Sequence, residues 1–242
     1  MNTIENLNPS SRRSFLKSSS LAVAGAVAAP LILGTKSSAA SPGDTLKVGL
    51  IGCGGRGSQA ALNALTADKN AVITAVADLY EDKAHGSLKN MRASEFKDRV
   101  DVKDERVFSG FDAYKGVLES NIDVVILATP PGFRPQHMKA AVEANKHMFI
   151  EKPMATDAPG VRSIMESVAE AKRRKLAVCA GFCWRYNHAE QALYQHILDG
   201  QIGDMRTMYA TYNTGFLWDR TNPKDKTELE KQLRNWMYYT WL

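Results

Sequence analysis

The chain has 242 residues, of which 44% are hydrophobic and 24% charged, and these values are ordinary for a globular protein. Its net charge is +5, but residues 1–40 supply +3 of it, so the remainder is too weakly basic to indicate a nucleic-acid-binding protein. Cys53, Cys179 and Cys183 form neither a disulfide framework nor a zinc-ligand spacing, so we expect no metal site. The apolar surroundings of Cys179 predict a small core residue.

Residues 1–40 have the pattern of an export signal rather than of a folded domain. Arg12 and Arg13 precede Phe-Leu-Lys, as in twin-arginine signals, and small residues over 38–40 suit cleavage. The apolar stretch over 21–33 is about 13 residues long, shorter than the roughly 20 that span a membrane. We therefore expect the twin-arginine machinery as a partner and a periplasmic or otherwise exported protein; an uncleaved leader acting as an anchor is the alternative.

Short apolar runs alternate with amphipathic stretches from residue 45 to 180. The runs predict strands over 46–51, 71–77, 106–108, 124–128, 147–150 and 176–179. The stretches between them predict helices over 58–65, 80–92, 112–119, 135–144 and 157–174. Asp157 is the expected cap of the last helix, and the basic run 172–175 is interpreted as its C-terminal end. Strands separated by helices indicate βαβ units, so we predict an α/β, doubly wound parallel sheet of the Rossmann type.

The pattern changes after Gly203. Residues 205–212 alternate partly, as a half-exposed antiparallel strand would, whereas 219–226 predict a loop and 228–236 a helix. We expect residues 181–242 to begin a second, α+β domain with an open antiparallel sheet. The aromatic-rich end of the sequence is interpreted as a truncation within that domain.

Residues 52–57 fit the pattern G-x-G-x-x-G. The motif follows a predicted strand and opens a predicted helix, which is the context that a dinucleotide-binding turn requires. Gly52 would permit the tight turn, Gly54 and Gly55 the close approach of a pyrophosphate, and Gly57 the packing of helix on strand. Amides at the start of the helix would then face the anion.

Asp78 closes the second predicted strand, where an acid that binds the adenosine ribose is expected. Its carboxylate would accept hydrogen bonds from both ribose hydroxyls and repel a 2′-phosphate, so we expect NAD, with NADP as the alternative. A turn residue without a ligand is the other interpretation of Asp78. Arg56 would contact a 2′-phosphate or the pyrophosphate, or would remain in solvent.

Two more turns, over residues 128–131 and 151–153, follow the fourth and fifth predicted strands, at the edge of the sheet where ligands bind. Taken with the glycine motif, they resemble the glucose–fructose oxidoreductase and inositol dehydrogenase (Gfo/Idh/MocA) family over about residues 45–242. The residues that carry this resemblance are Thr129-Pro130, His137, Lys146-His147 and Glu151-Lys152-Pro153.

The resemblance implies hydride transfer between a nicotinamide cofactor and a sugar, cyclitol or related polyol, in a homo-oligomer when the protein is full length. It implies that Lys152 is the catalytic residue beside the nicotinamide and the reacting hydroxyl, although on the residues alone Lys152 is a solvated surface lysine. Glu151 would contact the nicotinamide ribose, and Thr129 and Pro130 would line the cofactor cleft. Arg185 is a candidate contact to an anion or a carboxamide, with a structural salt bridge as the alternative.

The sequence does not identify a catalytic histidine. His137 is interpreted as a structural residue near a helix start rather than as a base. Members of the family usually carry a catalytic His with an acid four residues later, and no H-x-x-x-D follows Trp218. We expect a dehydrogenase or oxidoreductase; a glycoside hydrolase or lyase that uses NAD for a transient keto sugar, and a non-catalytic dinucleotide-binding sensor, are the alternatives.

Overall fold

The computed structural model describes residues 44–221, 223–225 and 227–242. The predicted twin-arginine signal over residues 1–40 lies outside the described residues. Within the described part, no helix has both the length and the apolar character needed to cross a membrane. The same part contains no group of three or more His, Cys, Asp or Glu side chains placed to hold a metal ion.

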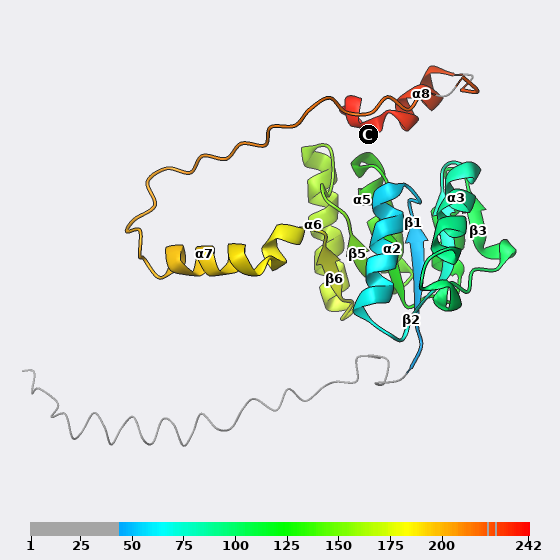
Figure 1. Cartoon of the computed structure of the whole chain (residues 1–242), viewed down its shortest axis with the longest axis horizontal. Helices are drawn as coiled ribbons and strands as arrows, with labels where there is room; N and C mark the ends of the chain where they lie inside the picture. The colour runs from blue at the N-terminus through cyan, green and yellow to red at the C-terminus, as the bar shows by residue number, and fades with distance from the viewer. Residues whose placement is uncertain (1–43, 222, 226) are drawn as a thin grey trace, which may run out of the picture. The chain divides into compact units, whose positions relative to one another are not determined.

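Six parallel strands form one sheet in the order β3-β2-β1-β4-β5-β6 (Figure 1). The strands are β1 (Leu46–Ile51), β2 (Ala71–Asp78), β3 (Val107–Ser109), β4 (Val124–Leu127), β5 (His147–Ile150) and β6 (Val178–Ala180). All six follow the predicted apolar runs, with small shifts at their ends. Strands of this kind are rich in Val and Ile because both faces of a parallel sheet are buried.

Helices cover both faces of the sheet. They are α2 (Gly55–Ala67), α3 (Glu81–Arg92), α4 (Ala113–Glu119), α5 (Arg134–Glu143) and α6 (Ala158–Arg173). On one face, Leu65 of α2 and Met91 of α3 pack with Leu50 of the sheet. On the other face, α4, α5 and α6 form a second core, in which Met138 packs with Leu127. The predicted doubly wound α/β class is therefore confirmed.

The strand order reverses between β1 and β4, at the centre of the sheet. β1 pairs with β2 on one side and with β4 on the other, so β2 and β3 extend the sheet toward one edge and β4, β5 and β6 extend it toward the other. In open α/β sheets of this topology, ligands bind in the crevice beyond the carboxyl ends of the two central strands. The turns after β1 and β4 therefore frame the expected site.

The start of α6 is capped as predicted, and the basic run at its end also binds the end of α5. Asp157 caps α6 through its side chain, which accepts a hydrogen bond from the Gly160 amide at 2.7 Å. The guanidinium of Arg174 donates to the carbonyl oxygens of Val142 and Glu143. The basic run thus also neutralises the carbonyl end of α5, where cations are favourable.

Residues beyond β6 depart from the prediction. Residues 205–212 are exposed and form no strand, so the predicted antiparallel strand is wrong. A strand needs a neighbouring strand to accept and donate its backbone hydrogen bonds, and partial alternation in the sequence does not provide one. In the described ranges, no strand follows Ala180. The structure instead contains a helix that was not predicted, α7 (His188–Leu198), and places α8 (Glu228–Arg234) and a 3-10 turn, Trp236–Tyr238, where a helix was expected.

Cys179 was expected in the core, and this prediction is wrong. β6 is the edge strand of the sheet, and the Cys179 side chain is exposed. The apolar pattern of the last strand does not reveal that no further strand or helix covers it within the described residues. Cys53, in contrast, is a buried residue of the glycine turn itself.

Candidate functional site

The turn between β1 and α2 requires glycine for steric reasons. Gly52 has φ 100°, and a Cβ built there would lie 2.6 Å from the carbonyl carbon of Ala128. A Cβ on Gly57 would overlap the carbonyl oxygen of Gly52. Both positions therefore depend on glycine, one for its backbone conformation and one for the close packing of α2 on the turn.

Gly54 and Gly55 differ, because a Cβ at either would meet open space. Gly54 is the N-cap of α2, no side chain caps this end, and the first turn contains no acidic residue. The first amides of an α-helix have no acceptor within the helix, and they carry the positive end of its dipole. An uncapped, accessible helix start of this kind is an anion-binding site.

Asp78 joins the glycine turn to the start of α3. Its Oδ2 accepts a hydrogen bond from the Cys53 amide at 2.7 Å, and its Oδ1 accepts one from the Tyr80 amide at 3.0 Å. Burial raises the pKa of Asp78, and the two amide hydrogen bonds oppose that shift. Each carboxylate oxygen has a second lone pair, so Asp78 can still accept hydrogen bonds from a ligand.

A cavity of about 380 Å³ lies beyond the carboxyl ends of the strands. Of the residues predicted to bind cofactor, those that line it are Gly52, Gly54, Asp78, Thr129 and Pro130. The opposite wall comes from the end of the chain, through Arg220, Thr221, Pro223, Leu233, Arg234 and Trp236. A concave site between two walls, with a few polar groups in its lining, is typical of cofactor sites.

Arg56 and Glu151, both predicted cofactor contacts, bind each other. The Nε and Nη2 atoms of Arg56 both lie 2.6 Å from Oε1 of Glu151. The Glu151 carboxylate is 2% exposed, whereas about half of the Arg56 side chain is in solvent. This ion pair, which neither interpretation of Arg56 included, links the first turn of α2 to the end of β5.

Lys152 follows Glu151 directly and is exposed. Its side chain makes no hydrogen bond or ion pair with any residue in the described part of the chain, so its ammonium is a free cation at the end of β5. Because the Glu151 amide donates to the Leu127 carbonyl at 2.9 Å, this turn lies beside the one after β4. Neither Glu151 nor Lys152 lines the cavity, and the catalytic role of Lys152 stays a prediction.

Arg185 belongs to the 3-10 turn Cys183–Tyr186 after β6 and is exposed. Its guanidinium has no hydrogen-bond or ion-pair partner among the described residues. The structure therefore supports no salt bridge at Arg185, and its predicted contact with an anion or carboxamide stays a prediction.

Arg134 is a residue of this region that sequence reasoning missed. It is 3% exposed, and it donates to the carbonyl oxygen of Thr129 at 2.6 Å and to that of Pro153. Burial lowers the pKa of Arg134 to about 10, an effect that the charge of Glu151 opposes, so it stays cationic at neutral pH. It ties the turn after β4 to the turn after β5, and no local sequence pattern signals so distant a partner.

His137 lies in α5, where it is buried and lines the cavity. Its Nδ1 is 3.2 Å from the Thr129 hydroxyl, and its ring lies 4.4 Å from that of Tyr114, measured between centroids. Burial, together with the positive charge of Arg134, lowers the pKa of His137 to about 4. A neutral, enclosed imidazole agrees with its interpretation as a structural residue.

Comparison with known proteins places this fold and site in context. The family described as "Oxidoreductase family, NAD-binding Rossmann fold" matches residues 46–182. Inositol 2-dehydrogenase from Klebsiella pneumoniae is 29% identical over 161 residues, covering 66% of this chain and 43% of the relative. A glycosyl hydrolase family 109 protein from Solibacter usitatus is 28% identical over 211 residues, covering 86% and 47%. The chain thus spans less than half the length of these curated relatives.

Solved structures of a dehydrogenase and a ketoreductase are also similar to this chain. Apo scyllo-inositol dehydrogenase from Lactobacillus casei superimposes with a TM-score of 0.52 at 26% identity, over 66% of this chain and 44% of that one. A variant of a 3-ketoreductase from Actinomadura kijaniata, solved with TDP-benzene and NADP, gives 0.50 at 25% identity, over 66% and 46%. Because the family matches more than half of the chain and the fold agrees, the chain belongs to the Gfo/Idh/MocA oxidoreductase family, which has an NAD-binding Rossmann fold.

Proposed function

We propose that this protein is an oxidoreductase that transfers a hydride between NAD and a sugar, cyclitol or related polyol. The observation that carries the proposal is the uncapped glycine turn, which opens onto the same cavity as the Asp78 carboxylate. Names of relatives, an inositol 2-dehydrogenase and a sugar ketoreductase among them, support the substrate class.

The described residues fit a dinucleotide. Open space above Gly54 and Gly55 suits a pyrophosphate at the start of α2, and the free lone pairs of Asp78 suit a ribose diol. The negative charge of Asp78 supports NAD rather than NADP, because it would repel a 2′-phosphate. A bound nicotinamide dinucleotide would supply the hydride acceptor or donor.

Lys152 is the proposed catalytic residue. Its ammonium has no partner in the described part of the chain, so it is available to donate a hydrogen bond to a substrate hydroxyl. In that position it would stabilise the negative charge that develops on the oxygen and relay the proton. Arg134 would serve this chemistry indirectly, by holding the turn that carries Lys152 against Thr129.

The proposal is tested by assaying the purified protein with NAD and a panel of inositols and sugars, following NADH by absorbance. We expect NADH to form, and the Lys152→Met variant to lose about 10²-fold or more in kcat while NAD still binds. Lys172→Met, which removes an exposed lysine from the end of α6, is the matched control and should keep full activity. An unchanged rate for Lys152→Met would remove this residue from the chemistry.

The same assay separates redox turnover from redox-assisted cleavage. Net NADH formation indicates a dehydrogenase, whereas cleavage of a sugar without net NADH indicates a hydrolase or lyase that reoxidises its cofactor in each cycle. The name of the glycosyl hydrolase family 109 relative is compatible with either outcome.

We also propose that the protein is exported by the twin-arginine pathway. Arg12 and Arg13, with the apolar stretch and small residues that follow, support this. The pathway carries folded proteins, so NAD would be bound before export. Replacing both arginines with lysine should keep the protein in the cytoplasm on cell fractionation; export of that variant at the normal level would refute the proposal.

A further inference from the structure

The cofactor cavity has few free cations to meet a pyrophosphate. Arg56, on the glycine turn itself, is committed to the buried Glu151. The cationic side chains that line the cavity are those of Lys83, Arg220 and Arg234. Arg234 is paired with Asp225 at 2.7 Å and is 13% exposed, and the charge of Lys83, on α3, interacts with that of Asp78.

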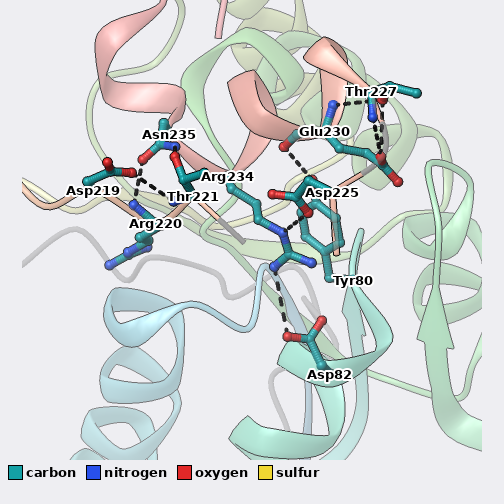
Figure 2. A network of polar contacts seen from close by, with 10 residues as sticks. All are labelled: Tyr80, Asp82, Asp219, Arg220, Thr221, Asp225, Thr227, Glu230, Arg234 and Asn235. Carbon is teal, nitrogen blue, oxygen red and sulfur yellow. Dashed lines mark hydrogen bonds and ion pairs between the residues drawn. The ribbon is translucent and has the colours of Figure 1, made fainter. Parts of the chain in front are cut away.

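Arg220 remains, and its guanidinium is unpaired among the described residues. It stacks on the ring of Trp218, with Cζ 4.2 Å from the ring centroid, which leaves its N–H groups available. Figure 2 shows the Arg220 side chain extending toward the first turn of α2, and Arg220 lines the same cavity as Gly52 and Gly54.

The backbone of Arg220 is held in place by a hydrogen bond to Asn235. Its amide donates to Oδ1 of Asn235 at 2.8 Å, and Asn235 is 8% exposed. Asn235 follows α8, which begins with a capping box formed by Thr227 and Glu230 (Figure 2).

Three contacts fasten α8 to the dinucleotide-binding fold. The Tyr80 hydroxyl donates to the Glu230 carbonyl at 3.0 Å, and the guanidinium of Arg234 lies 3.8 Å from the centroid of the Tyr80 ring. The Nη1 of Arg234 is also 3.9 Å from Oδ2 of Asp82. Arg220 is therefore held at a fixed place opposite the glycine turn.

We propose that Arg220 binds the pyrophosphate of the dinucleotide from the wall opposite the glycine turn, so that the two phosphates lie between backbone amides of α2 and a guanidinium. A guanidinium donates two parallel hydrogen bonds to phosphate oxygens, and its stacking on Trp218 orients it before the ligand arrives. The inference rests on the proposed function and adds to it a contact from the chain's last segment.

Calorimetric titration of the purified protein, freed of any retained nucleotide, tests this contact with three probes: NAD, ADP-ribose and adenosine. Arg220→Gln should weaken NAD and ADP-ribose by about tenfold or more, because a charged hydrogen bond to phosphate is lost. Adenosine, which has no phosphate, should bind as it does to the wild type. Arg220→Lys should lose less, because it keeps the charge without the bidentate geometry.

The matched control is Arg206→Gln, which removes an arginine that is 86% exposed and does not line the cavity. It should leave all three affinities unchanged, and circular dichroism should show the same melting temperature for both glutamine variants. Equal losses for adenosine and NAD, or no loss for NAD, would overturn the role of Arg220. If the wild type bound neither NAD nor ADP-ribose, the proposed function itself would fail.

Discussion

The guanidinium of Arg56 binds Glu151, with its Nε and Nη2 atoms 2.6 Å from one buried carboxylate oxygen. The pair connects the glycine turn to the turn that carries Lys152, which are far apart in the sequence. Arg134 approaches the same region from α5, and its charge interacts with that of Glu151. The two turns most directly involved in the proposed chemistry are thus held together by cations that interact with the buried Glu151 carboxylate.

Removing Arg56 should therefore destabilise the fold. Arg56→Met should lower the free energy of unfolding by about 1–3 kcal/mol, because the buried Glu151 carboxylate loses its charged donor. The lower half of that range is favoured, since Arg56 is half-exposed and water can partly replace it. Urea denaturation at pH 7 measures the change.

Arg206→Met provides the comparison, since Arg206 and its partner Asp204 are both almost fully exposed. That variant should change the stability by less than about 0.5 kcal/mol. Equal stability of the two variants would show that the Arg56 pair contributes no more than a surface ion pair.

Alanine substitutions at Gly57 and Gly54 should have different effects, the first mainly on the stability of the fold and the second mainly on NAD affinity. Gly57→Ala should lower stability by about 3 kcal/mol or more, because the added Cβ overlaps the Gly52 carbonyl and the backbone must move. Gly54→Ala should cost at most about 1 kcal/mol, since its Cβ meets open space and only a preferred N-cap residue is lost. The same Cβ would obstruct the pyrophosphate, so NAD affinity should fall by about tenfold or more in calorimetric titration.

Gly86→Ala is the control for these two variants. Gly86 lies inside α3, where an added Cβ also meets open space and alanine is the better helix former. We expect unchanged NAD affinity and stability equal to or slightly above that of the wild type. If Gly54→Ala bound NAD normally, the pyrophosphate would not lie at the start of α2.

Acid should destabilise the protein through His137. The pKa of His137 is lowered to about 4 in the folded chain, against an ordinary value near 6.5 in the unfolded chain. Between these values the unfolded state binds more protons, so stability is fully present above pH 6.5 and is lost as the pH falls toward 4. The full effect is on the order of 3 kcal/mol, at about 1.4 kcal/mol for each pH unit of difference.

The variant His137→Phe keeps a ring against Tyr114 but cannot titrate. Its stability should depend less on pH between 6.5 and 4 than that of the wild type, measured by urea denaturation at several pH values. His85→Gln, which alters an exposed histidine on α3, should leave the wild-type pH dependence intact. Parallel curves for wild type and His137→Phe would contradict the buried neutral state of His137.

Sequence reasoning succeeded where the constraint is local and failed where it depends on distant neighbours. Gly52 and Gly57 are required by backbone conformation and contact within one turn, so the motif alone indicated them. The partners of Arg56 and Arg134 come from other strands and helices, and no spacing in the sequence encodes them.

The same limit explains the errors beyond β6. The polar and apolar alternation over 205–212 is compatible with a strand, but the described chain supplies no neighbouring strand for it. Helix α7 was missed because none of its residues is buried, although Asn187 provides a side-chain cap that the sequence could have indicated.

Asp78 should determine the choice between NAD and NADP. Asp78→Asn keeps the size of the side chain but removes the charge, so it no longer repels a 2′-phosphate and accepts weaker hydrogen bonds from a ribose. We expect NAD to bind about tenfold more weakly and the ratio of NADP to NAD affinity to rise, both measured by calorimetry. Asp204→Asn, which removes a charge that is 88% exposed and outside the cavity lining, should leave that ratio unchanged.

Acidification should produce the same change in the wild-type protein. Because burial raises the pKa of Asp78, its carboxylate takes up a proton at a higher pH than an exposed aspartate does. Discrimination against NADP should therefore weaken as the pH falls, while the Asp78→Asn variant shows no such trend. If the affinity ratio of the wild type stayed constant with pH and Asp78→Asn bound both cofactors as the wild type does, cofactor selection would not depend on this carboxylate.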